Sequence, residues 1–183
     1  MNTITPAKRT VLAALCVALC VVLPMAFHAI PDGGSIFLPM HIPVLICGLV
    51  CGWPYGFLCG LMGPALSCLL TGMPPAAFLP AMMVECGVYG LVSGLMLLFV
   101  HTQNTRLDLY IALITAMIAG RVVSGIAKAL IFTPGLSLTA WITASFVTAL
   151  PGIVIQLVLI PLLVSLLMKS RQIPARYPQG ENV

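Results

Sequence analysis

The stretch Val11-Leu-Ala-Ala-Leu-Cys-Val-Ala-Leu-Cys-Val-Val-Leu-Pro-Met-Ala-Phe27 contains no charged side chain. A helix that crosses the hydrocarbon core of a bilayer needs about 20 predominantly apolar residues. This run, with its neighbours, reaches that length and predicts a membrane-spanning helix. The basic pair Lys8-Arg9 precedes it, as in a secretory signal peptide. However, the apolar run is long and no small-residue cleavage site follows, so we expect the span to be retained.

The composition of the whole chain supports a membrane protein. Of 183 residues, 61% are hydrophobic and only 7% are charged, whereas about 25% is usual for charged residues in a soluble domain. So few charges cannot cover a water-exposed surface, which excludes a soluble globular domain and a disordered chain. The formal net charge of +4 is not clustered, which excludes a nucleic-acid binder. An all-α integral membrane protein remains.

Breaks at charges, Pro/Gly clusters and polar runs divide the chain into six apolar segments. We expect spans at about 10–28, 36–52, 55–71, 78–100, 109–132 and 141–168. These spans form one domain over residues 1–170, and a C-terminal tail at 171–183 follows it. The second and third spans are short and joined at Gly52-Trp53-Pro54-Tyr55, which predicts a tight hairpin. The alternative is a chain of five spans in which 36–71 is partly re-entrant.

The basic residues indicate the orientation. With six spans, one side of the membrane receives Lys8, Arg9, Arg106, Lys169, Arg171 and Arg176. The connections 29–35, 72–77 and 133–140 on the other side contain no Lys or Arg. The positive-inside rule therefore predicts a multi-pass protein of the cell membrane with both termini in the cytoplasm. Five spans would place the C-terminal basic cluster outside, so the split also favours six.

Small residues predict how the helices pack. Glycine recurs at Gly48, Gly52, Gly56 and Gly60, and again at Gly90 and Gly94. Because small residues let helix backbones approach each other in lipid, we assign these glycines to internal contacts. The seven cysteines fall inside spans without C-x-x-C spacing, and we interpret them as packing residues. Trp53 and Tyr55 are assigned to an inner aromatic belt, and Trp141 lies where an outer one is expected.

Polar side chains within the spans are the best indication of function, because each costs several kcal/mol in hydrocarbon, from about 2.5 upward. They are Glu85 in span four, Arg121 and Lys128 in span five, and Gln156 in span six. Arg121, Ser124 and Lys128 share one helical face, and Glu85 and Tyr89 share another. At about 1.5 Å per residue, all lie between the outer surface and the midplane. The pattern predicts a polar lining that is open to the outside.

Two interpretations of this lining stay open. In the first, Glu85 and Arg121 form a structural ion pair and Lys128 extends to the outer headgroups. In the second, the two cations and one anion leave one net positive charge, which an anionic ligand relieves. A carboxylate suits the guanidinium fork of Arg121. His41, near the outer end of span two, is either a helix-end group or a ligand contact. The outer loops His28–Ser35 and Thr71–Pro75 are candidate caps.

Catalysis is not indicated. The sequence contains no G-x-x-x-x-G-K-[ST], H-E-x-x-H or G-x-S-x-G motif. The three histidines, His28, His41 and His101, are expected on different sides of the membrane and cannot form one metal site. We therefore expect no enzyme activity, no cofactor and no bound metal.

Five stretches in order along the chain carry a resemblance to a known family. They are Phe37-Leu-Pro-Met-His-Ile-Pro-Val-Leu-Ile-Cys-Gly48, Leu70-Thr-Gly-Met-Pro-Pro75, Glu85-Cys-Gly-Val-Tyr-Gly-Leu-Val-Ser-Gly94, Gly120-Arg-Val-Val-Ser-Gly125 and Leu150-Pro-Gly-Ile-Val-Ile-Gln156. Together they resemble the S components, the substrate-binding subunits, of energy-coupling factor (ECF) vitamin transporters, in particular the pantothenate-type and related members.

The resemblance implies a six-helix bundle that binds one small vitamin at its outer side. It also implies docking on a transmembrane coupling protein driven by two ATP-binding subunits, and toppling of the S component to deliver its cargo. Family members meet the coupling protein through A-x-x-x-A in span one, which Ala14-Leu-Cys-Val-Ala18 matches. The charge argument favours a carboxylate, so pantothenate leads among the B vitamins and their precursors. The alternatives are an autonomous small channel or exporter and a membrane scaffold without a ligand.

Overall fold

The structure, a computed structural model, describes residues 4–27, 33–132 and 137–177. Within these ranges every regular element is a helix, and six stretches are long and apolar enough to cross a membrane. The all-α, six-span prediction is confirmed. The five-span alternative is wrong, because the second and third spans are separate helices on either side of Gly52, whose φ of 96° favours glycine.

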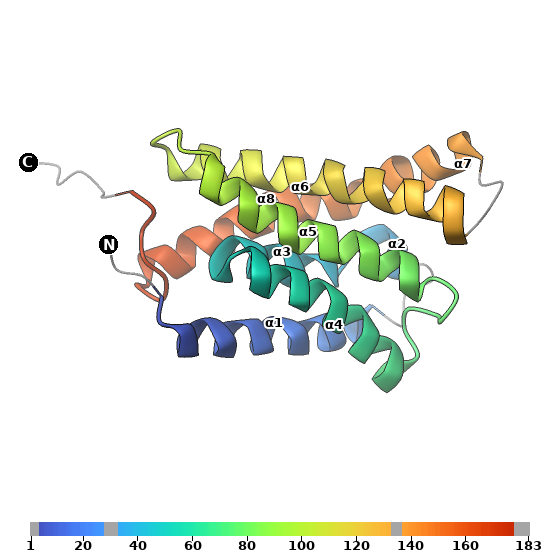
Figure 1. Cartoon of the computed structure of the whole chain (residues 1–183), viewed down its shortest axis with the longest axis horizontal. Coiled ribbons are helices and arrows are strands. Elements are labelled where there is room, and N and C mark those ends of the chain that lie inside the picture. Colours follow the sequence, from blue (N-terminus) through green and yellow to red (C-terminus); the bar gives the residue numbers. More distant parts are fainter. Residues whose placement is uncertain (1–3, 28–32, 133–136, 178–183) are drawn as a thin grey trace, which may run out of the picture.

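The spans are helices packed side by side. They are α1 (Pro6–Ala26), α2 with α3 (Gly33–Phe37 and His41–Cys51), α4 (Trp53–Thr71), α5 (Leu79–Phe99), α6 continued by the π-helical η1 (Thr105–Ala127 and Lys128–Phe132), and α8 (Leu150–Lys169). A short α7 (Leu138–Ile142) and the π-helical η2 (Thr143–Thr148) precede α8. α1 and α4 lie on one side and α6 on the other, with α3 and α5 between them (Figure 1).

The first span begins and the last span ends at the same end of the bundle, and α7 lies at the opposite end (Figure 1). We refer to the α7 end as the outer end, following the distribution of basic residues. The sixth expected span, 141–168, was wrong at its start, because α8 begins at Leu150. Pro151 lies in the first turn of α8, where its missing N–H is tolerated but where it interrupts a helix arriving from upstream.

Backbone contact through glycine joins α3, α4 and α5. A Cβ on Gly56 would lie 2.4 Å from the carbonyl oxygen of Gly90, and one on Gly90 would lie 2.0 Å from that of Gly56. A Cβ on Gly48 would lie 2.5 Å from the same Gly90 oxygen. The predicted internal role of these glycines is confirmed, since any side chain there would force the helices apart.

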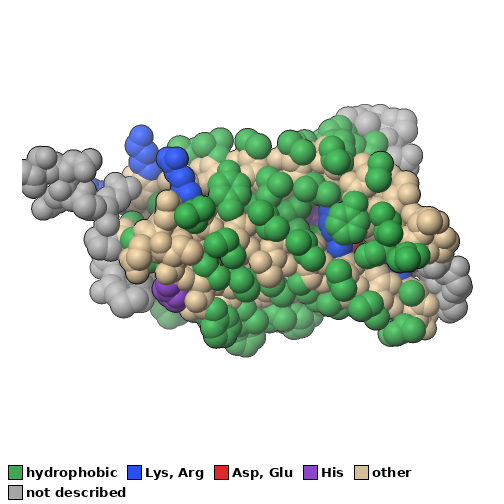
Figure 2. All heavy atoms as spheres, turned by 90° about the horizontal axis from the view of Figure 1, so that it is seen from above, with side chains coloured by type: hydrophobic (Ala, Val, Ile, Leu, Met, Phe, Trp, Pro, Cys, Tyr) green, Lys and Arg blue, Asp and Glu red, His purple; other side chains and the backbone are tan. Residues whose placement is uncertain are grey.

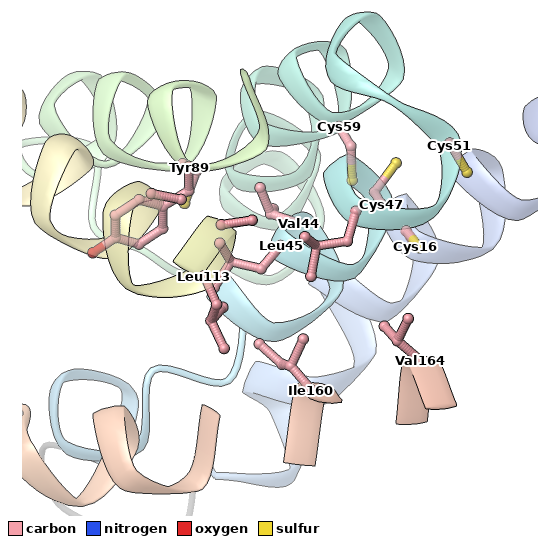
Figure 3. Packing of buried hydrophobic residues seen from close by; sticks show 14 of the residues in the cluster. Cys16, Val44, Leu45, Cys47, Cys51, Cys59, Tyr89, Leu113, Ile160 and Val164 are labelled. Atoms are coloured by element: carbon pink, nitrogen blue, oxygen red, sulfur yellow. The ribbon is translucent and has the colours of Figure 1, made fainter. Parts of the chain in front are cut away.

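Thiols fill the space beside this contact. Six of the seven cysteines are buried, all except Cys68, and those drawn in Figure 3 lie among apolar side chains of α1, α3 and α4. The buried ring of Tyr89 borders the same core, and its hydroxyl points away from the thiols (Figure 3). The hydrophobic core is therefore continuous on one side of α5, while a polar region begins on the other.

The residues after α8 are packed against the inner end of the bundle. Ile173 is buried in the core. Arg176 Nε lies 2.6 Å from a carboxylate oxygen of Asp108, which is itself fully buried in the first turn of α6. Tyr177 and Thr102 donate hydrogen bonds to the same carboxylate. This contact, the Asp108 clamp, binds the start of the predicted tail to α6.

Candidate functional site

Glu85, in the second turn of α5, is the centre of the polar region. Tyr89 Oη donates to Glu85 Oε1 over 2.9 Å, and Ser124 Oγ donates to Oε2 over 2.9 Å. Lys128 Nζ lies 3.7 Å from Oε2, and His41 Nε2 lies 3.7 Å from Oε1. The structure thus brings together five of the predicted site residues, from α3, α5, α6 and η1.

The ionic partner of Glu85 is Lys128, and the direct pair with Arg121, one of the two open interpretations of the sequence, is not formed. The two helices α5 and α6 run antiparallel, and Tyr89 lies against Gly120, where a Cβ would meet its ring at 2.1 Å. This register places Glu85 beside Ser124 and Lys128. Arg121 therefore lies deeper in the bundle, at the level of Tyr89. Lys128 has an anionic partner within the bundle, so its side chain does not have to extend to the lipid headgroups.

Arg121 is buried without a hydrogen-bond partner for two of its nitrogens. Its side chain is 3% exposed, and neither Nε nor Nη2 has an acceptor among the described residues. The guanidinium carbon lies 5.5 Å from the centre of the Phe146 ring, a cation–π contact. Because a buried charge without a counter-charge is costly, Arg121 is the group in the bundle that most needs an anion.

The segment α7–η2 supplies two residues that the sequence analysis did not place in the site. Trp141 lies against α6 at Gly125, where a Cβ would be 2.4 Å from the indole, and its Nε1 is buried without a partner among the described residues. The rings of Trp141 and Phe146 meet edge to face at 5.9 Å. Trp141 is therefore partly buried against α6 near the outer end of the bundle. The sequence feature that could have indicated this contact is Gly125, four residues after Arg121, because a glycine there leaves room for a large ring against α6.

Gln156 and His41 form the second part of the site. Gln156 is fully buried, and its Nε2 donates to the carbonyl oxygen of Leu38 over 3.5 Å. The His41 ring lies 5.2 Å from the Tyr89 ring. Neither His41 ring nitrogen nor Gln156 Oε1 has a hydrogen-bond partner in the described chain.

Most of the orphaned buried polar atoms of the described chain gather in this one region. They belong to Arg121, His41, Trp141 and Gln156, and only Arg9 Nε and Ser67 Oγ lie elsewhere. Buried polar groups in folded proteins are nearly all satisfied by protein, water or ligand. With Glu85 and Lys128 paired, the guanidinium is the remaining charge, so the region can accept an anion that also offers hydrogen-bond partners.

The surface over this region is mostly apolar. Figure 2 shows basic side-chain atoms between hydrophobic ones on the face above α6, and the Lys128 side chain is 30% exposed. An apolar groove of about 440 Å³ runs beside it, lined by Val122, Gly125, Ile126, Ala129, Leu138 and Trp141. Among the described residues, no group of three or more His, Cys, Asp or Glu side chains could hold a metal ion.

The remaining predicted residues lie away from this cluster. Ala14 and Ala18 are exposed on the outward face of α1, where they do not pack internally. The predicted cap at 28–35 falls largely outside the described residues. In the other predicted cap, Thr71 Oγ1 donates to the Ser67 carbonyl oxygen and accepts the Met73 N–H. In the described chain, Thr71 and Met73 make no hydrogen bond to the cluster.

The fold defines an all-helical, multi-pass membrane protein of six spans. The family model for the substrate-specific component of ECF transporters matches residues 8–164, and the chain belongs to this family. It is a family of transporter components, not of enzymes. No curated protein and no solved structure matches the chain.

Proposed function

We propose that this S component captures a small carboxylate-bearing vitamin from outside the cell, with pantothenate as the leading cargo and other B vitamins or their precursors as the alternatives. The observation that carries this proposal is the buried, orphaned guanidinium of Arg121. A carboxylate accepts two parallel N–H bonds from an arginine fork. Trp141 Nε1 offers a further donor from the segment that covers α6.

Glu85 has a supporting role in this proposal. Its carboxylate is held by Tyr89 and Ser124 and neutralised by Lys128. A carboxylate so satisfied does not compete for Arg121, which stays available for the cargo. His41 and Gln156 then contact the uncharged part of the ligand.

Uptake requires partners in this proposal. The exposed Ala14 and Ala18 on α1 form the docking face for the transmembrane coupling protein, to which two ATP-binding subunits supply the energy. Small side chains at four-residue spacing allow close approach of a partner helix in lipid. Reconstituted vesicles should take up the cargo only with the complete ECF module, and transport by this chain alone would count against the assignment.

The charge requirement can be tested with a matched pair of ligands. Pantothenate and pantothenol differ only in the replacement of the carboxylate by a hydroxymethyl group. We expect pantothenate to raise the melting temperature of the purified protein and pantothenol to have little effect. The same measurement over a panel of B vitamins identifies the cargo if pantothenate does not bind. A panel in which neutral members bind as tightly as acids would overturn the role of Arg121.

A further inference from the structure

Gln156 is held in one orientation by an unusual turn. Its Nε2 donates to the carbonyl oxygen of Leu38, a non-glycine residue with φ of 50°. The same oxygen accepts the backbone N–H of His41 over 3.1 Å. Left-handed backbone at a leucine persists only where the surroundings hold it, and such positions cluster at functional sites. The Leu38 carbonyl is thus fixed between the start of α3 and the second turn of α8.

Close packing of α8 reinforces this orientation. Gly152 lies one turn before Gln156, and a Cβ there would be 2.7 Å from the carbonyl oxygen of Ile36. Helix α8 therefore lies directly on the 36–38 backbone, and Gln156, four residues on, faces the same turn. The amide is positioned by two contacts of the fold.

With Nε2 bonded to Leu38, Gln156 Oε1 faces away from the turn. It is fully buried and has no donor among the described residues. An amide oxygen left without a donor in a buried site loses its hydration without compensation. The atom that it lacks is a donated hydrogen, such as that of a ligand hydroxyl.

We infer that Gln156 is a specificity-determining residue that selects a hydrogen-bond donor on the cargo. The inference rests on the proposed function and adds to it that the ligand is a small acid that also carries a hydroxyl group. Sites built to bond a substrate hydroxyl reject analogues that lack it, because the buried acceptor is then left unpaired. The anion at Arg121 and the donor at Gln156 are separate requirements.

The test uses pantothenate and N-(3,3-dimethylbutanoyl)-β-alanine, which has the same skeleton and carboxylate but neither hydroxyl. We expect the wild type to bind pantothenate about 10- to 100-fold more tightly, the range for one unsatisfied buried acceptor. Gln156→Met, which keeps the volume and removes the acceptor, should lose this preference. It should keep the preference for pantothenate over pantothenol, whereas Arg121→Ala should show the opposite pattern.

Each outcome decides between the two proposals. Equal binding of the hydroxylated and deoxygenated acids by the wild type, or an undiminished preference in Gln156→Met, would overturn the inference alone. Should Gln156→Met not fold, Gln156→Leu also removes the acceptor and must lose the preference. Should another vitamin of the panel bind instead, retention of wild-type affinity for it by Gln156→Met overturns the inference. If no member binds, the proposed function fails, and the inference with it.

Discussion

The two sides of α5 are packed in different ways. Towards α4, Gly90 brings the backbones into contact, and buried thiols fill the adjoining space. Towards α6, Glu85 and Tyr89 meet Ser124 and Lys128. Arg121 on α6 and Gln156 on α8 carry buried polar atoms that have no hydrogen-bond partner among the described residues. The difference shows that the glycine side supplies a rigid frame. The polar side is left incomplete, and we attribute that to a ligand.

The largest expected effect comes from breaking the glycine side. Gly90→Leu would place a Cβ 2.0 Å from the carbonyl oxygen of Gly56. Because backbone cannot yield like a side chain, we expect a loss of more than about 4 kcal/mol and little folded protein. Yield and size-exclusion profile in detergent measure this. The control Gly87→Ala meets only side chains, the nearest at 3.3 Å, and should remain folded.

The next largest effect is expected on α1, where substitutions should block uptake without changing vitamin binding. Ala14→Trp or Ala18→Trp adds a large ring to the exposed face of α1. We expect vitamin binding to be unchanged and uptake by the reconstituted transporter to be abolished, because a partner helix can no longer approach closely. Val158→Trp, at a position of α8 that is 62% exposed, is the matched control. Normal uptake by both α1 variants would remove the docking assignment.

On the polar side, Arg121→Ala should weaken binding of the acidic vitamin by about 2–3 kcal/mol, or roughly 30- to 150-fold, the value of a charge-assisted bond. Its thermal stability without ligand should stay the same or increase, since an unpaired buried charge is removed. Isothermal titration calorimetry and thermal unfolding measure both. Arg106→Ala, at an exposed position, should change neither. A strongly destabilised Arg121→Ala with unchanged affinity would indicate a structural role.

The smallest expected effect concerns the segment over α6. Trp141→Phe keeps an aromatic side chain but removes the Nε1 donor together with the pyrrole part of the indole, so we expect a loss of about 1 kcal/mol, or roughly fivefold, in affinity. In a Trp53→Phe background, the emission of Trp141 should shift when the vitamin binds. Unchanged emission at saturating vitamin would show that the indole does not contact the cargo. The α7–η2 segment would then contribute no hydrogen-bond donor to the site.

Hydropathy and charge were sufficient to predict six spans, because the cost of exposed backbone in lipid permits few alternatives. Helical spacing placed Glu85 with Tyr89 and Ser124 with Lys128. It did not identify the partner of Glu85, because that depends on the register between α5 and α6, which Gly120 and Tyr89 set. The break before Leu150 has no signature in hydropathy, so Trp141 and Phe146 were not predicted as residues of the site. The left-handed backbone of Leu38 has no such signature either.

The Asp108 clamp has a practical consequence for handling the protein. The described residues after α8 would pass for a dispensable basic tail, yet a truncation before Arg176 would strip a buried carboxylate of its cation. The remaining Thr102 bonds are neutral. Affinity tags and fluorescent fusions should therefore start beyond Tyr177. Shortened versions made to improve crystals should keep both Arg176 and Tyr177.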